Sequence, residues 1–281
     1  MKQVSQNRSF GGVQGVYRHA SISTGTDMTF AVYVPDHQDG TKLPVLWYLS
    51  GLTCNHANVM EKGEYRRLAS ELGLIIVCPD TSPRGDNVPD DADDYAMGQG
   101  AGYYLDATQE PWSKNFQMRT YIEKELPALI TEQFPMADMD RQAIFGHSMG
   151  GHGALTIALH NPDRFKSVSA FAPIVSPIHS PWGQKAFAAY LGDNQTNWRQ
   201  YDACALIEDG ARVADILVDQ GTSDQFLEEQ LKPHLLQAAC DQAGTDLTLN
   251  MREGHDHSYF TISTFMNDHL RWHAQRLGIL S

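Results

Sequence analysis

The sequence contains no apolar run of membrane-spanning length, and its first residues lack the apolar core of a secretion signal. A transmembrane helix needs about 20 predominantly apolar residues, and a signal peptide has an apolar segment of ~7–15 residues. Neither pattern is present. We therefore expect a protein that has no membrane partner and works in the cytoplasm.

Basic residues are also in short supply. The chain has 21 Lys and Arg against 34 Asp and Glu, which gives a formal net charge of −13. Nucleic acids and anionic membrane surfaces are both recognised through basic patches. The charge balance therefore argues against nucleic acid and against a membrane surface as partners.

Cysteine is scarce and widely spaced, with no C-x-x-C pair that would indicate a metal or redox motif. We expect free thiols in a reducing compartment at all four positions, Cys54, Cys78, Cys204 and Cys240. The chain also lacks a Pro/Gly/Ser-rich linker, an internal repeat and a low-complexity stretch. We therefore predict that residues 1–281 form one domain.

The most informative stretch that is present is GHSMG at residues 146–150. Apolar residues 143–145 precede it, as on a buried strand, and small residues such as Gly151 and Ala154 follow it, as at the start of a packed helix. A G-x-S-x-G sequence between strand and helix is the nucleophile elbow of an α/β-hydrolase. This pattern predicts that Ser148 is a catalytic nucleophile.

A nucleophilic serine needs a histidine base and an acidic residue to orient that base, and in this fold they follow in the order Ser, Asp or Glu, His. The predicted strand at residues 214–218 is followed by Asp219 and Asp224. Asp224 is preferred because it lies in the loop, where its carboxylate can reach a histidine. The loop after the predicted strand at 246–251 carries His255 and His257, and spacing alone does not choose between them.

The rest of the chain alternates strand and helix patterns, which predicts a mostly parallel central sheet with helices on both faces, as in the α/β-hydrolase fold. We interpret residues 80–112 as a long functional loop and residues 174–212 as a cap-like insertion over the sheet. The acidic cluster in the long loop does not have EF-hand spacing, so no calcium site is predicted there. The further strands are expected at 13–23, 28–34, 44–49, 74–78 and 168–172, and helices at 61–72, 116–134, 226–243 and 260–276.

Acyl transfer places negative charge on the former carbonyl oxygen, and backbone N–H groups must meet that charge. One donor in this fold is the residue after the nucleophile, here Met149, and the other comes from the loop after the third strand. That loop is residues 50–54, so we predict Leu52 as the second donor, with Gly51 allowing close backbone approach.

Several blocks of sequence resemble the S-formylglutathione hydrolase (esterase D) family over essentially the whole chain. They are residues 48–54, 98–104 with 106–108, 146–154, 224–227 and 256–260. The resemblance implies Ser148 as nucleophile, Asp224 as acid and His257 as base. One departure is His255, where many relatives carry tyrosine.

The resemblance further implies hydrolysis of S-formylglutathione to glutathione and formate through a formyl-serine intermediate, with no metal and no organic cofactor, in a homodimer. A broad short-chain carboxylesterase would use the same three residues and stays open as an alternative. A non-catalytic α/β-hydrolase that acts as a binding protein is disfavoured, because such a protein is expected to have lost one of them. An acyltransferase also stays open as an alternative, because acyl transfer differs from hydrolysis only in the exclusion of water from the site.

The sequence indicates the residues of the acyl pocket and of the glutathione site less specifically than the catalytic residues. Candidates to line the acyl pocket are Cys54, Tyr103, Tyr104 and Trp182, although the aromatic residues fit an ordinary core equally well. Cys54 fits either a small buried hydrophobe or a reactive thiol. The glutathione carboxylates require a cation, and the candidates that border the pocket are Lys62, Arg84, Lys114 and Lys185.

Overall fold

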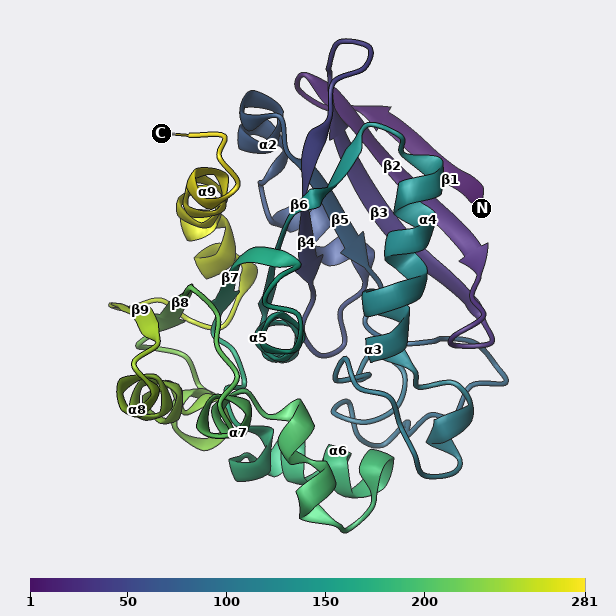
Figure 1. The fold of residues 1–281 in the computed structure, drawn as a ribbon. Helices are drawn as coiled ribbons and strands as arrows, with labels where there is room; N and C mark the ends of the chain where they lie inside the picture. The colour runs from purple at the N-terminus through teal and green to yellow at the C-terminus, as the bar shows by residue number, and fades with distance from the viewer. Residues whose placement is uncertain (281) are drawn as a thin grey trace.

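The computed structural model describes residues 1–280. Its centre is a nine-stranded sheet with the order β1-β2-β3-β5-β4-β6-β7-β8-β9 (Figure 1). The first three strands pair antiparallel, as does β3 with β5, and the strands from β5 to β9 pair parallel. The strands are β1 Lys2–Arg8, β2 Gly12–Ala20, β3 Asp27–Pro35, β4 Leu43–Leu49, β5 Ile75–Pro79, β6 Ala137–His147, β7 Phe165–Phe171, β8 Asp215–Gly221 and β9 Asp246–Arg252.

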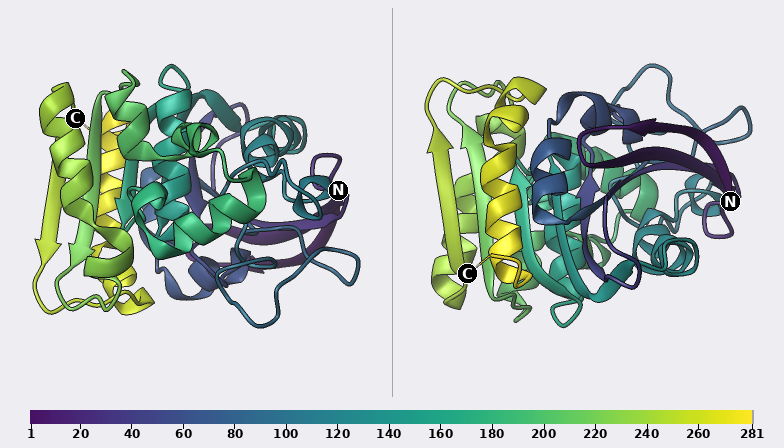
Figure 2. Two further views of the ribbon diagram at one scale, coloured as in Figure 1. Left: turned by 90° about the horizontal axis from the view of Figure 1, so that it is seen from below. Right: turned by 90° about the horizontal axis from the view of Figure 1, so that it is seen from above.

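Helices cover both faces of this sheet, which confirms the predicted architecture (Figure 2). One face packs against α1, α2 and α9 through residues such as Val59, Leu68 and Met266. The other face packs against α4, α5, α7 and α8 through residues such as Ile130 and Leu236. The helices are α1 His56–Lys62, α2 Arg66–Leu72, α3 Met118–Thr120, α4 Leu126–Gln133, α5 Met149–His160, α6 Pro181–Leu191, α7 Ala203–Glu208, α8 Pro233–Ala243 and α9 Tyr259–Arg276.

The central strands are buried because both of their faces are covered. All residues of β4 and of β5 are buried, in agreement with their continuous apolar sequences. The edge strand β1 is different, since all of its residues are exposed and its sequence KQVSQNR is largely polar. Sequence patterns therefore missed β1, which is held by its pairing with β2 rather than by burial.

Two predicted helices are interrupted in the structure. The helix expected at 61–72 is divided into α1 and α2, and Glu64 between them has a φ of 56°. The helix expected at 226–243 is a π-helical turn, η6 Leu227–Leu231, followed by α8. Lys232 at the break has a φ of 50°, and Pro233 starts α8. A left-handed residue cannot continue a right-handed helix, so each helix ends there.

The segment 174–212 leads from β7 to β8 and contains α6 and α7 with the short turns η3 Pro177–His179, η4 Gln195–Asn197 and η5 Arg199–Tyr201. In Figure 1, α6 lies below the sheet, beside the long loop 80–112. Tyr190 of α6 joins the two segments. Its hydroxyl accepts a hydrogen bond from the Gly98 N–H and donates one to the Ala101 carbonyl, both at 2.9 Å. The segment 174–212 and the long loop therefore support each other at this end of the molecule.

The remaining short turns are η1 Trp112–Lys114, within the predicted loop, and η2 Tyr121–Glu125, which connects α3 to α4. Within residues 1–280, none of the helices has both the length and the apolar character needed to span a membrane.

Candidate active site

Ser148 lies at the sharp turn between β6 and α5, with φ 57° and ψ −118°. Glycine is required on both sides of it. A Cβ on Gly146 would lie 2.3 Å from the carbonyl oxygen of Gly150, and a Cβ on Gly150 would lie 1.9 Å from that of Leu49. Real Cβ atoms do not approach backbone so closely. The packing of the turn against β4 therefore explains the two glycines, and the strained serine is held there by its surroundings.

Asp224 and His257 form the charge-assisted pair that a serine nucleophile needs. The Nδ1–H of His257 donates to Oδ2 of Asp224 at 2.6 Å. The same carboxylate accepts from Nε2 of Gln220 at 3.1 Å and from the N–H of Phe226 at 2.9 Å. Its acceptor positions are thus occupied by donors, which fixes its orientation and leaves the far nitrogen of His257 for the substrate side.

The competing residues Asp219 and His255 are engaged elsewhere. Asp219 is buried in β8 and accepts from Asn250 at 2.7 Å and from Arg252 at 2.9 Å. The His255 ring packs edge-on against Phe265, with centroids 4.8 Å apart. The structure therefore pairs Asp224 with His257.

Ser148 and His257 line one cavity of about 190 Å³, together with other residues from the loop after β4, the long loop, α6 and the loop after β8. The predicted Leu52, Cys54 and Trp182 also line it. Gly51, the glycine expected to allow close backbone approach, lines it as well. The sequence did not predict the other four lining residues, which are Thr53, Tyr95, His147 and Phe226. Phe226 follows Asp224 by two residues, and this closeness to a candidate catalytic acid is the feature of the sequence that could have indicated a cavity residue.

Tyr103 and Tyr104 do not reach this cavity, which corrects their assignment to the acyl pocket. Both side chains are fully buried. The Tyr104 hydroxyl donates to the Ser50 carbonyl at 2.8 Å, and the Tyr103 hydroxyl donates to the Ala96 carbonyl at 3.2 Å. Burial raises the pKa of each phenol well above its usual value. They support the loops around the cavity from behind.

The two predicted oxyanion donors flank Ser148. Met149 is the first residue of α5, and helix geometry leaves its N–H without an intrahelical acceptor. Within residues 1–280, neither this N–H nor that of Leu52 donates to another group. A Cβ on Gly51 would lie 3.2 Å from the Cβ of Ser148, so the glycine brings the loop close to the nucleophile. Unpaired donors at this place suit an oxyanion.

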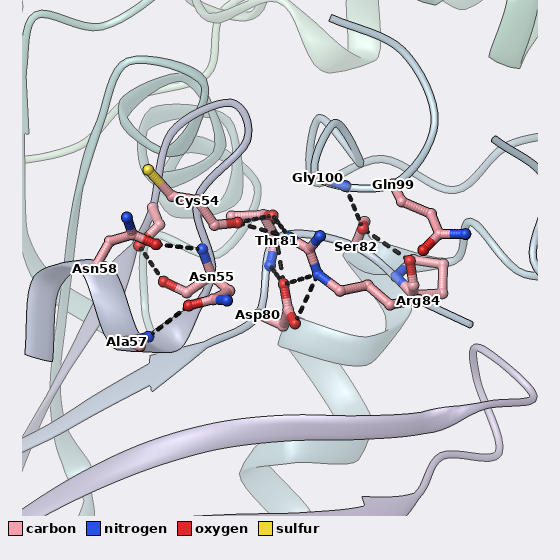
Figure 3. A network of polar contacts seen from close by, with 12 residues as sticks. Cys54, Asn55, Ala57, Asn58, Asp80, Thr81, Ser82, Arg84, Gln99 and Gly100 are labelled. Atoms are coloured by element: carbon pink, nitrogen blue, oxygen red, sulfur yellow. Dashed lines mark hydrogen bonds and ion pairs between the residues drawn. The ribbon is translucent and has the colours of Figure 1, made fainter. Parts of the chain in front are cut away.

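A polar network fixes the loop that carries Leu52 (Figure 3). The Cys54 carbonyl accepts from Oγ1 of Thr81 at 2.6 Å and from Nη2 of Arg84 at 2.9 Å. Arg84 also pairs with Asp80 at 3.0 Å. Figure 3 shows that the Cys54 sulfur points away from this network. Arg84, one of the four glutathione candidates, is thus committed to holding the loop.

The Cys54 thiol is half-buried, and burial raises its pKa. The Tyr259 hydroxyl and the charge of Lys62 act in the opposite direction without reversing the shift. The thiolate is the nucleophilic form of cysteine, so a raised pKa lowers its reactivity. Of the two interpretations of Cys54, this geometry favours a small apolar residue of the cavity wall.

Burial keeps two histidines near Ser148, His147 and His152, neutral. Desolvation lowers the pKa of His147 well below its usual value, and the nearby His257 lowers it further. The rings of these two residues lie 4.4 Å apart. His152, one turn into α5, donates from Nε2 to the Tyr103 carbonyl at 3.0 Å, and burial lowers its pKa to about 4.

His152 predicts a pH dependence of stability. The unfolded chain protonates this histidine near its ordinary pKa of about 6.5, whereas the folded protein keeps it neutral down to about 4. The unfolded state therefore binds more protons in between, and the free energy of unfolding falls as the pH falls through this window. Between about pH 7.5 and pH 5, wild type should lose about 2 kcal/mol more than His152→Gln does.

Urea unfolding of both proteins at the two pH values measures this difference. The comparison with His152→Gln removes the contributions of other buried groups, since both proteins share them. Equal losses of stability in the two proteins would contradict the assignment of a neutral, buried His152.

No group of three or more His, Cys, Asp or Glu side chains within residues 1–280 is arranged to hold a metal ion. The pair His255 and His257 does not form a ligand set, because His257 is bonded to Asp224 and the His255 ring packs on Phe265. The side chains at this site are those of acid–base and nucleophilic chemistry.

Comparisons with known proteins agree with this arrangement. The Esterase family model matches residues 21–275. The S-formylglutathione hydrolase of Paracoccus denitrificans is 54% identical over 275 residues, which cover 98% of each chain, and that of Mus musculus is 48% identical over 281 residues, which cover 99% of each. The structure of an S-formylglutathione hydrolase from Agrobacterium tumefaciens superimposes with a TM-score of 0.97 at 61% identity, covering 99% of this chain and 100% of that one. The chain belongs to the S-formylglutathione hydrolase family of α/β-hydrolase esterases.

Proposed function

We propose that this protein hydrolyses S-formylglutathione to glutathione and formate. The observation that carries the proposal is the identity of 48% and 54% to S-formylglutathione hydrolases over nearly the whole chain. It is supported by the site itself, where Ser148 and the Asp224–His257 pair meet at one small cavity. The reaction is a step of formaldehyde detoxification.

In the proposed mechanism, His257 removes the proton of Ser148 while the serine oxygen attacks the formyl carbon. The N–H groups of Leu52 and Met149 stabilise the oxyanion, and Asp224 stabilises the imidazolium. The carbon–sulfur bond then breaks, and the glutathione thiolate takes the proton from His257. Water, activated by the same histidine, attacks the formyl ester and releases formate with recovery of Ser148. No metal or organic cofactor takes part in these steps.

The cavity of about 190 Å³ suits a formyl group rather than a long acyl chain. In this proposal, residues 174–212 act as a cap within a single domain of residues 1–281. Trp182 of α6 and Phe226 wall the cavity together, with ring centroids 4.7 Å apart. A wall of two aromatic rings limits the length of the acyl group that the cavity accepts.

We also propose that the enzyme is a homodimer of the cytoplasm, as the family resemblance implies. All four cysteines are free, and burial raises the pKa of the three fully enclosed thiols. Free thiols are typical of proteins from a reducing compartment.

The proposed function predicts a strong preference for the thioester. The value of kcat/KM for S-formylglutathione should exceed that for p-nitrophenyl acetate by about a thousandfold, because only the thioester brings the binding energy of its glutathione part to the transition state. Steady-state kinetics with both substrates on the same preparation measures the ratio. Turnover of the simple ester alone would reject the glutathione substrate and leave a broad carboxylesterase.

A further inference from the structure

The catalytic cavity is too small for the whole substrate. Small-molecule sites usually enclose about 300–1,000 Å³, whereas this cavity holds about 190 Å³. It has room for the reacting thioester, so the peptide part of glutathione must lie outside it. A second cavity, of about 530 Å³, is lined by Lys62, Glu64, Ser258, Tyr259, Phe260 and Ser263. We call it the Lys62 groove.

The Lys62 groove adjoins the catalytic cavity. His257 lines the catalytic cavity, and the next residue, Ser258, lines the groove. A second connection runs from Cys54 on the cavity side to Tyr259 on the groove side. The Tyr259 hydroxyl and the Lys62 charge both act on the Cys54 thiol and lower its pKa against the effect of burial. The linings of the two cavities are therefore neighbours in the chain and in space.

The groove carries one cation and one anion that do not neutralise each other. Within residues 1–280, neither Lys62 nor Glu64 takes part in an ion pair, although both line the groove. Two other glutathione candidates are engaged, since Arg84 pairs with Asp80 and Lys185 pairs with Asp94. The fourth candidate, Lys114, is exposed on η1 and lines neither cavity. Lys62 is thus the cation beside the active site that is available for a ligand.

Glu64 is brought to the groove by an unusual backbone. Its φ of 56° ends the helical path after α1 and starts a new one at α2. Phe260, on the first turn of α9, is 84% exposed at the edge of the same groove. The groove therefore offers an apolar edge beside the charges of Lys62 and Glu64.

Glutathione offers a matching group. Its γ-glutamyl end is a free α-amino acid, with a carboxylate and an ammonium on one carbon, whereas its glycyl end has a carboxylate alone. Charges of both signs in one groove fit the γ-glutamyl end, because a carboxylate ligand alone would leave Glu64 repelling it.

We propose that the Lys62 groove binds the γ-glutamyl end of glutathione, with Lys62 on its α-carboxylate and Glu64 on its α-ammonium. The proposal rests on the proposed function for its substrate. It makes Lys62 and Glu64 specificity-determining residues, which act on substrate binding and not on the bond-breaking step.

The test uses competition, which does not require the protein to cleave a glutathione thioester. Hydrolysis of p-nitrophenyl acetate is followed while S-methylglutathione, its glycyl ethyl ester or S-methyl-N-acetylcysteinylglycine is added as inhibitor. In Lys62→Met, the Ki of the first two should rise about tenfold relative to wild type, the loss expected for one charge-assisted contact. The Ki of the third should change by less than about twofold, because it lacks the γ-glutamyl group.

Three further results sharpen the assignment. Lys62→Arg should restore most of the affinity, Glu64→Gln should weaken the same two inhibitors, and the matched control Lys114→Met should behave as wild type. If S-formylglutathione is cleaved, its KM should rise in Lys62→Met while kcat stays within about twofold.

The inference is overturned if Lys62→Met weakens all three inhibitors equally, or none of them. It is also overturned if esterification of the glycyl carboxylate abolishes the effect of Lys62, since that result would place the glycyl end in the groove. Failure of the proposed function looks different: S-formylglutathione would not be cleaved, while the inhibitor series would still report on the groove.

Discussion

Ser148→Ala is expected to reduce kcat/KM for S-formylglutathione by about 10⁶, close to the loss caused by removing the whole catalytic group in a serine hydrolase. The proposed formyl-enzyme cannot form without the serine oxygen, and His257 then has no hydroxyl to activate. A residual rate above that in water should persist from the two oxyanion donors and from substrate binding. Steady-state kinetics at high enzyme concentration measures the loss.

Ser113→Ala is the matched control, because it removes a hydroxyl from the turn η1 that within residues 1–280 bonds only to Glu110 and does not line the cavity. It should retain wild-type activity. Thermal unfolding of Ser148→Ala should show a Tm no lower than that of wild type. Within residues 1–280 the backbone of Ser148, and not its hydroxyl, makes the hydrogen bonds of the turn, so the substitution removes none of them. Persistent activity in Ser148→Ala would reject Ser148 as the nucleophile, and with it the proposed mechanism.

Sequence patterns predicted the structure correctly where neighbouring residues determine it. The apolar run of β4 could be predicted because a strand covered on both faces must be apolar throughout. The elbow could be predicted because the contacts of Gly146 and Gly150 exclude any side chain at either position. In both cases the requirement can be read within a few neighbouring residues.

The same patterns failed where distant contacts decide. The choice between His255 and His257 depends on how the loop after β9 meets the end of β8. There the Ser223 N–H donates to the His255 carbonyl at 2.9 Å, and a Cβ on Gly221 would lie 2.2 Å from that carbonyl oxygen. This tight contact fixes the backbone at His255 and leaves His257 to reach Asp224. The spacing of residues along the chain cannot predict this contact between the two loops.

The aromatic residues around the site show the same limit. The sequence leaves Tyr103 and Tyr104 of the long loop open as pocket-lining or core residues, and the structure places both in the core, fully buried and with positive φ. Tyr95, from the acidic part of that loop, lines the cavity instead. Which side of a long loop faces the site is set by its packing on α6, and a sequence without regular periodicity cannot indicate it.

The two aspartates that the sequence proposed as alternatives should give opposite results on substitution. Asp224→Asn is expected to lower kcat by about 10⁴, because the amide can no longer hold the correct tautomer of His257 or stabilise its cation. Its effect on stability should be small, since an amide can still occupy the position with little change in volume. Kinetics and urea unfolding on the same preparations separate the two effects.

Asp219→Asn should instead damage stability. Burial alone raises the pKa of Asp219, but the nearby His269 ring and hydrogen bonds from Asn250 and Arg252 outweigh burial and hold the pKa below its usual value. The neutral amide leaves Arg252 with only its longer contact to Asp268, at 3.7 Å, in place of the close pair with a buried carboxylate, which is expected to lower the free energy of unfolding by about 3 kcal/mol. Because these contacts tie β8 to β9 rather than touch the cavity, kcat should fall by less than about tenfold. A loss of about 10⁴ in kcat for Asp219→Asn, with Asp224→Asn near wild type, would exchange the roles of the two residues.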